Sequence, residues 1–270
     1  MESLEQLWTF FSNAILCGVL IAVTCSFLGL LVIWKRVVFV GITLAEVSAA
    51  GIAFAFLCGF SPFIGAALFT LAVVTVLAFP FESRLVPRDA MLGVLFVLAA
   101  ALSILIVSYS QLGMDEVKEV LYGNLLVAGS GDLVANVSVL IPVLILSCLF
   151  FRNILYTSVD RDMSRIMGLK VNLWELMFFY ALGLAISVAS KSAGSILVFT
   201  YLVVPGTTGM VLAKRMGGIF MVTATSAVLA TVGGIYASFM WDMPTSQLII
   251  VFTVGLLALA WGFRLVRPHA

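Results

Sequence analysis

The sequence predicts an all-α, polytopic membrane protein, a transmembrane helical bundle of about nine spans. Two observations carry this prediction. Of the 270 residues, 63% are hydrophobic and only 10% are charged, and the mean hydropathy is +1.22. The apolar residues are also gathered in long runs, and a bilayer core about 30 Å thick needs about 20 helical residues to cross it. Soluble domains do not contain so many runs of this length, so that class is excluded.

Nine apolar stretches reach or approach the length of a membrane span. In chain order they are Leu7 to Trp34, Val37 to Phe60, Pro62 to Phe81, Ala90 to Tyr109, Leu133 to Phe151, Leu173 to Ser190, Ala193 to Ala213, Ile219 to Trp241 and Ser246 to Phe263. The first is long enough to include a lead-in helix at the membrane surface. Because no low-complexity linker divides the chain, residues 1–270 are expected to form one transmembrane domain.

A polar segment, residues 152–172, separates the fifth and sixth stretches. It includes the sequence YTSVDRDMSRIMGLKVN, in which apolar residues recur at helical spacing. These residues are Val159, Met163, Ile166 and Met167. The pattern predicts a short amphipathic helix outside the bilayer, with Gly168 placed to end it. We expect a soluble partner to dock there.

The basic residues predict the orientation of the chain. If the spans alternate and the polar segment is cytoplasmic, 12 of the 14 Lys and Arg residues lie on the cytoplasmic side. Only Lys118 and Lys191 then lie outside. This bias has the sense that the positive-inside rule requires, so the N-terminus is predicted outside and the C-terminus inside.

Glu46 is the only ionisable residue in the middle of a predicted span. It lies ten residues after Arg36, which is about 15 Å at helical rise and near the bilayer midplane. A carboxylate at that depth must face protein, water or a cation, so an ion or substrate path is the leading hypothesis. The alternative is a protonated acid that forms a hydrogen bond with a neighbouring helix.

The seventh stretch contains Pro205 and Gly206 within the sequence VVPGTTG. Proline removes one backbone donor and frees the carbonyl of Tyr201, so a kink or break is expected there. Broken helices beside a pathway often serve transport, which makes this segment a candidate for gating. An ordinary proline kink is the alternative.

The sequence excludes several kinds of chemistry. His269 is the only histidine, so neither a histidine-based metal site within the membrane nor a histidine-based triad can be built. The nucleotide-binding pattern G-x-x-x-x-G-K-[ST] does not occur. We therefore predict no catalytic residues and no cofactor bound by the chain itself.

These features resemble the permease subunit of the zinc, manganese and iron ABC importers, a family related in fold to vitamin B12 and siderophore permeases. The resemblance covers nearly the whole chain and rests on LLVIWKRVVFVGITLAEVSAAGIAFAF, RDAMLGVLF, YGNLLV, VDRDMSRIMGLKVNLWELMF and AGSILVFTYLVVPGTTGMVLAKR. It implies a type II importer-like fold in a bacterial inner membrane. It also implies a homodimer that works with two ATP-binding cassette ATPase subunits and an external solute-binding protein to import a divalent metal ion or metal chelate.

The same resemblance assigns a role to the polar segment. The cytoplasmic loop of the family typically has an aspartate, a small residue four positions later and a glycine after four more, as at Asp160, Ser164 and Gly168. The implied role is a coupling helix that fits into a cleft on the ATPase. The residues implied in coupling are Asp160, Met163, Ser164, Met167 and Gly168. ATP and Mg²⁺ are then bound by the partner.

The expected metal motif is altered in this chain. Family members that carry a free cation usually have Gly-Asp-x-Leu-x-His, whereas Ile42 replaces the aspartate here and Glu46 the histidine. One carboxylate suits a hard cation and is a poor zinc site. Two copies in a homodimer could face one pathway, or a chelate could use a wider passage. A secondary transporter or cation channel without an ATPase is the alternative function.

Overall fold

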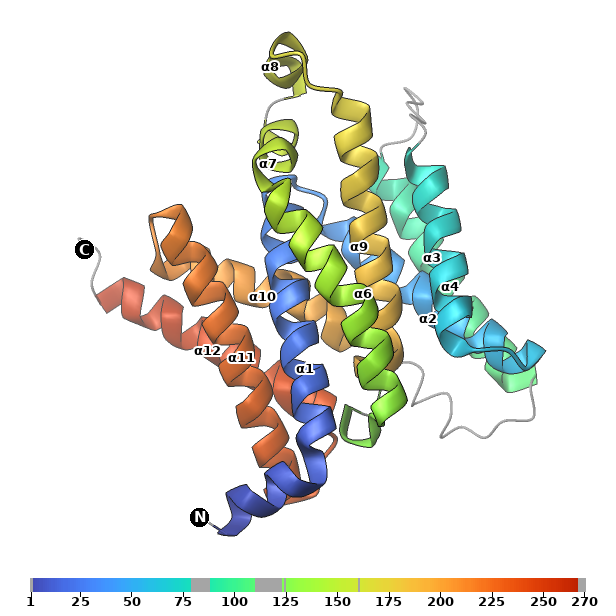
Figure 1. Cartoon of the computed structure of the whole chain (residues 1–270), viewed down its shortest axis with the longest axis vertical. Helices are drawn as coiled ribbons and strands as arrows, with labels where there is room; N and C mark the ends of the chain where they lie inside the picture. The colour runs from blue at the N-terminus through green and yellow to red at the C-terminus, as the bar shows by residue number, and fades with distance from the viewer. Residues whose placement is uncertain (1, 79–87, 110–122, 124, 160, 267–270) are drawn as a thin grey trace.

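The computed structural model describes residues 2–78, 88–109, 123, 125–159 and 161–266, and every regular element in these ranges is a helix (Figure 1). The all-α prediction is therefore confirmed for the described part of the chain. The helices are α1 (Glu2–Trp34), α2 (Val38–Cys58), α3 (Pro62–Ala78), α4 (Arg88–Tyr109), η1 (Leu125–Val127), α6 (Ser130–Leu149), α7 (Phe151–Val159), α8 (Arg161–Ile166), α9 (Val171–Ala193), α10 (Ser195–Leu212), α11 (Met216–Trp241) and α12 (Thr245–Val266).

Eight helices of the described chain are long and apolar enough to cross a membrane: α1, α2, α4, α6, α9, α10, α11 and α12. The ninth expected stretch corresponds to α3, whose 17 residues extend about 25 Å. That is shorter than a bilayer core of about 30 Å. The end of that stretch, residues 79–81, lies outside the described residues, so a ninth span stays a prediction.

Helices α1 and α2 form the centre of the bundle. In the hydrophobic, membrane-length part of each helix, 67% of the residues of α1 and 78% of those of α2 are buried. The corresponding share is 17% for α12 and 22% each for α4 and α6. Helix α1 packs on α6, α10 and α11, whereas α2 packs on α3, α4 and α9. The apolar side chains that α4, α6 and α12 turn outward are those expected to face lipid.

Glycines allow two of these central contacts to be unusually close. Gly51 of α2 faces Gly65 of α3, and a Cβ atom on either would overlap backbone atoms of the other. Gly29 of α1 lies in the same way against the backbone of Leu202 in α10. Small residues let membrane helices approach closely and gain van der Waals contact. Helices α1 and α2 are therefore fixed tightly within the bundle.

Candidate functional site

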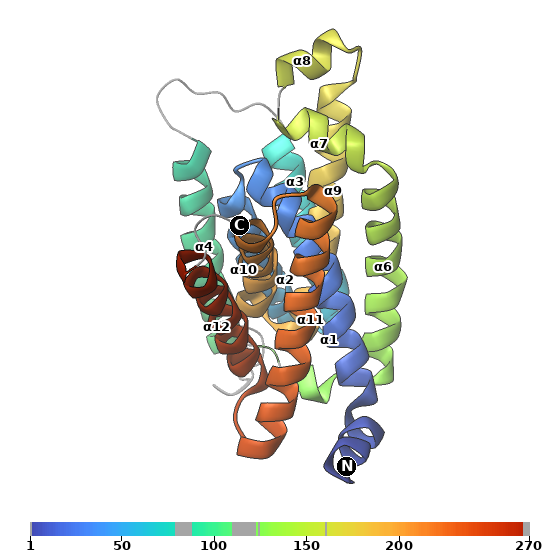
Figure 2. The ribbon, with the colours of Figure 1, turned by 90° about the vertical axis from the view of Figure 1, so that its left-hand side faces the viewer.

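The polar segment projects beyond one end of the bundle, and α1 begins at the opposite end (Figures 1 and 2). The described parts of the predicted helix are α7 and α8. Asp160 falls between them, outside the described residues. Only Leu169 and Lys170 separate Gly168 from the start of α9. The segment is thus a helical arm joined directly to a membrane-length helix.

Gly168 ends α8 as the sequence predicted. Its φ is +79°, in the left-handed region that favours glycine. The amide of Gly168 donates to the carbonyl of Arg165 at 3.0 Å, and the amide of Leu169 donates to the carbonyl of Ser164 at 3.0 Å. These two bonds form a Schellman motif, which satisfies carbonyls at the helix end. A Cβ atom at Gly168 would meet nothing within 4 Å, so the backbone conformation alone accounts for glycine here.

The apolar residues of α8 and its end face outward. Met163 is 58% exposed, Ile166 is 81% exposed and Met167 is 62% exposed. Ser164, in contrast, is buried. Exposed apolar side chains gathered outside the membrane-length helices are typical of a protein contact surface. The two methionines also suit a surface that adapts to a partner.

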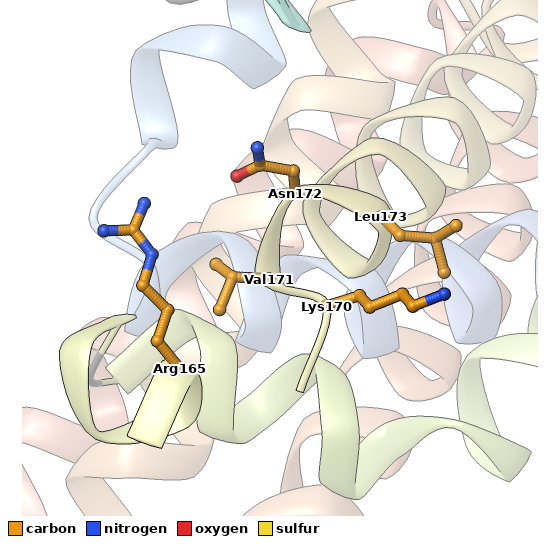
Figure 3. Close-up of a pocket in the computed structure, with 5 residues that line it drawn as sticks. All are labelled: Arg165, Lys170, Val171, Asn172 and Leu173. Carbon is orange, nitrogen blue, oxygen red and sulfur yellow. The ribbon is translucent and has the colours of Figure 1, made fainter. Parts of the chain in front are cut away.

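A hollow of about 360 Å³ lies where α8 meets α9. It is lined by Arg165, Lys170, Val171, Asn172 and Leu173 (Figure 3). In the figure, Arg165 extends from α8 toward the start of α9, where Val171 and Asn172 lie. The hollow adjoins the exposed apolar residues because Arg165 belongs to the same turn as Ile166. The arm therefore combines an apolar tip with a basic recess.

Aromatic rings hold the base of the arm to the bundle. Phe151, the first residue of α7, lies 5.1 Å from Phe220 of α11 between ring centroids, and it also contacts Phe27 and Trp34 of α1. Aromatic pairs at such distances contribute beyond their buried area. We call Phe27, Trp34, Phe151 and Phe220 the aromatic cluster. It links the arm to α1 and α11, so a displacement of α7 must move these rings.

Glu46 is buried in α2, with 7% of its surface exposed. The hydroxyl of Ser195 donates to Oε1 of Glu46 at 3.1 Å. Within the described part of the chain, Oε2 of Glu46 is buried and has no hydrogen-bond partner. The same is true of the hydroxyl of Ser48. Buried polar atoms normally have partners, so an orphan carboxylate oxygen calls for an explanation. Glu46 is therefore half satisfied by the protein.

Ser195 reaches Glu46 because of the turn between α9 and α10. Gly194 forms this turn with φ +85°. Gly123, with φ +64°, lies so close to Ala193 and Gly194 that a Cβ atom would overlap their backbone, and Ser246 donates to the carbonyl of Ala193 at 3.2 Å. Ser195 was not among the residues predicted from the sequence. The only signal for the turn was glycine in AGSILVF and YGNLLV.

Pro205 and Gly206 are buried within α10, which continues from Ser195 to Leu212 through both residues. Of the kink or break expected at Pro205, a break is not observed, whereas a kink and gating by this segment stay predictions. One reason for the continuity is that α10 is held by its neighbours on both sides of the proline. Tyr201 and Thr231 of α11 share a hydrogen bond of 2.6 Å between hydroxyl oxygens, and Gly206 faces Leu30 of α1.

The predicted metal residue is not part of a ligand cluster. Across the described ranges, no group of three or more His, Cys, Asp or Glu residues could hold a metal ion. Glu46 and the polar segment are also far apart in the fold, because they are associated with opposite ends of α9. The structure thus presents two separate regions, a projecting arm and a buried acid.

Comparison with known proteins shows similarity along nearly the whole chain. Residues 8–264 match the family described as the ABC 3 transport family. The chain is 27% identical over 258 residues to the manganese transport system membrane protein MntC of Halalkalibacterium halodurans, covering 95% of this chain and 88% of the relative. It is 26% identical over 277 residues to the chelated iron transport system membrane protein YfeC of Yersinia pestis, covering 97% and 93%.

A solved structure confirms the fold. The chain resembles a chain in the structure of PsaBC from Streptococcus pneumoniae in complex with Fab, with a TM-score of 0.86 and 22% sequence identity. The match covers 96% of this chain and 94% of that chain.

Proposed function

The chain belongs to the ABC 3 transport family, and from this premise we propose that it is the membrane permease of an ATP-binding cassette importer for a divalent metal ion or metal chelate. The family match spans residues 8–264, and similar proteins are described as manganese and chelated iron transport system membrane proteins. The structural observation that carries the proposal is the projecting arm, whose exposed Met163, Ile166 and Met167 need a partner surface.

The partner of the arm is an ATPase subunit. Two such subunits, a second copy of this chain and an external solute-binding protein complete the importer in a bacterial inner membrane. ATP and Mg²⁺ bind to the ATPases, and this chain provides the path. The residues that contact or shape the ATPase interface are Asp160, Met163, Ser164, Met167 and Gly168.

Transport is driven by movement of the arm. Closure of the ATPases on ATP displaces α8, and the Schellman motif at Gly168 keeps α8 in a fixed orientation to the start of α9. The aromatic cluster at the base of α7 passes the displacement to α1 and α11. Packed side chains with two arrangements can carry such coupling between distant sites. Pro205 and Gly206 are the segment of α10 best suited to bend during this change.

Glu46 contacts the cargo. Its oxygen Oε2, which has no hydrogen-bond partner, is a ligand for a hard cation. Carboxylate oxygen favours manganese or iron over softer metals that prefer thiolate ligands. One Glu46 from each copy of a homodimer would bring two carboxylates to a shared pathway. A chelate would contact the same acid while keeping most of its own ligands. The cargo is thus either a free divalent ion or a metal chelate, and cellular metal content and growth distinguish the two.

The topology proposed for this function has nine spans. Helix α3 crosses as the ninth, despite its short described length, because it packs on the buried helices α2 and α9. An odd number of crossings places the two termini on opposite sides of the membrane. With the arm and most basic residues in the cytoplasm, the N-terminus lies outside and the C-terminus inside.

The test is the manganese, iron and zinc content of cells with and without this chain under metal starvation. A selective fall in one metal on deletion supports import of the free ion. Unchanged free-metal uptake with loss of growth on a chelated source supports import of a chelate. Equal metal content and equal growth on every source would contradict the proposed function. The control is deletion complemented by the unaltered chain.

A further inference from the structure

A buried ion pair joins the end of α1 to the beginning of α9. The distance from Nζ of Lys35 to Oε1 of Glu175 is 3.0 Å, and the two side chains are only 7% and 17% exposed. The ammonium group also lies 5.8 Å from the ring centroids of Phe178 and Phe179, which are in α9 as well. Buried charges are retained only with close partners, and the Glu175 carboxylate and the two aromatic rings hold Lys35 to α9.

On one side, this ion pair is part of the turn that leads into α2. Lys35 follows the last residue of α1, and Arg36 has φ +57°, a conformation that residues other than glycine rarely adopt. The amide of Val37 donates to the carbonyl of Val32 at 3.1 Å, which closes the turn. Helix α2 begins at Val38, eight residues before Glu46. The position of Lys35 therefore sets where α2 begins.

On the other side, the ion pair lies directly after the polar segment. Glu175 is seven residues after Gly168 and in the second turn of α9. Trp174, its neighbour, packs on Phe150 at 5.1 Å between ring centroids, at the junction of α6 and α7. Trp34, the neighbour of Lys35, belongs to the aromatic cluster at the base of α7. Both partners of the ion pair are thus flanked by residues that hold the base of the arm.

We propose that the Lys35–Glu175 ion pair is a positioning contact that carries a displacement of the polar segment to the start of α2, and so to Glu46. This inference rests on the proposed function. Helix α1 packs mainly on α6, α10 and α11, and it meets α9 over a shorter stretch. A directional contact at that stretch keeps the α1–α2 turn in register with α9 when the arm moves, whereas apolar contacts alone allow sliding.

A second ion pair on α9 provides a matched control. Lys191 and Asp132 form an ion pair between α9 and α6, with side chains 27% and 19% exposed, and Lys191 lies 4.9 Å from the ring centroid of Phe63. It has the same chemistry and the same aromatic neighbour type as the Lys35–Glu175 pair. It lies at the opposite end of α9 from the polar segment, so the proposal gives it no part in transmission.

The experiment uses the complex that copurifies with this chain from its native host, reconstituted in liposomes. The quantity measured is the number of Mn²⁺ ions transported per ATP hydrolysed. Lys35→Met with Glu175→Gln should lower this ratio about fivefold, a size typical of coupling contacts. Exchange of the charges, Lys35→Glu with Glu175→Lys, should recover part of the loss, because the ion pair is restored but no cation faces the rings of Phe178 and Phe179. Asp132→Asn with Lys191→Met should leave the ratio within about twofold.

A second readout does not depend on transport. Amide hydrogen exchange at Val38, Phe39 and Val40 should change when ATP is added to the unaltered complex and to the Asp132/Lys191 control. It should not change in the neutral Lys35/Glu175 variant. Replacing both charges together avoids leaving one buried charge alone, so the variant is expected to fold and assemble.

The proposal is overturned if the neutral Lys35/Glu175 complex transports with the ratio of the unaltered complex. It is also overturned if the Asp132/Lys191 control loses as much, because an ion pair at the end of α9 remote from the polar segment would then affect coupling equally. If the unaltered complex moves no Mn²⁺ and no metal chelate with ATP, the proposed function itself fails. That result is seen before any variant is made, so the two failures are distinguishable.

Discussion

The polar segment and the surroundings of Glu46 are built in opposite ways. The polar segment turns its apolar side chains outward, with Ile166 81% exposed, and its helix is ended by a glycine in open space. Glu46 is a buried acid, and it receives a hydrogen bond from Ser195. One region exposes groups that water disfavours, and the other buries a group that the protein interior disfavours.

Each region is therefore incomplete in a different manner. The arm lacks a protein surface to cover its apolar residues, and Glu46 lacks a partner for one oxygen. Helix α9 connects the two, because it starts just after the arm and ends two residues before Ser195. On the proposed function, a partner protein acts on the first region and a cation on the second. Changes at the arm should affect binding of a partner protein, whereas changes at Glu46 should affect passage of a cation.

The largest expected effect comes from Glu46→Gln. The amide keeps a hydrogen-bond acceptor for Ser195 but loses the charge, so the variant should insert and assemble normally. If the carboxylate contacts the cargo, Mn²⁺ transport by the reconstituted complex should fall at least about tenfold. Binding of the ATPase subunits should be unchanged, since Glu46 is remote from the arm.

The control for this change is Asp242→Asn. Asp242 follows α11 with φ +51°, a conformation that asparagine adopts readily, and it is exposed. The same acid-to-amide change should leave transport unaltered there. Normal transport by a stably inserted Glu46→Gln protein would show that Glu46 has a structural role. It would contradict the claim that a cation acts on Glu46.

A smaller effect is expected from Gly168→Ala. Alanine at φ +79° costs about 1–2 kcal/mol, which shifts α8 toward other orientations. Transport-coupled ATP hydrolysis should fall about fivefold to tenfold, because the arm no longer presents one docking geometry. Metal affinity at Glu46 should not change.

Gly59→Ala is the matched control for Gly168→Ala. Gly59 ends α2 with φ +73°, and a Cβ atom there also meets nothing within 4 Å. The backbone cost is the same, but Gly59 lies away from the polar segment. Equal losses of coupling in the two variants would mean that backbone strain at either helix end lowers coupling. The arm would then have no specific role in coupling.

The smallest effect is expected from Met167→Asn. Loss of one exposed apolar contact should weaken ATPase binding about threefold to tenfold, measured by titration of the ATPase into the detergent-solubilised permease. Thermal stability of the permease alone should not fall, since the side chain is already 62% exposed. Met243→Asn, at a residue 53% exposed between α11 and α12, should leave ATPase binding as it was. Similar weakening by both changes would argue against a specific surface.

Much of the fold was predictable from the sequence because bilayer thickness imposes a length on each apolar run. In the part of the chain that the structure describes, eight of the nine stretches are helices of membrane length. The end of α8 was predictable as well, since Gly168 is the residue type that a Schellman motif requires.

The partners of the functional residues could not be predicted from one sequence. Glu46 was identified by its depth in the membrane, but Ser195 lies 149 residues away and looks like any small residue of a helix start. Lys35 was counted only among the basic residues and Glu175 was not singled out, since nothing in their spacing shows that the end of α1 meets the second turn of α9. Such pairs depend on tertiary packing, which periodicity does not encode.

The measurement that tests the central claim most directly is Mn²⁺ uptake into liposomes that contain this chain alone, or this chain with its copurified ATPase subunits, its solute-binding protein and ATP. We predict uptake only when the ATPases and ATP are both present, and loss of that uptake when ATP is replaced by a nonhydrolysable analogue. Uptake by the chain alone, driven by an ion gradient and abolished by Glu46→Gln, would contradict the account. The protein would then be a secondary cation transporter, and the arm would have another purpose.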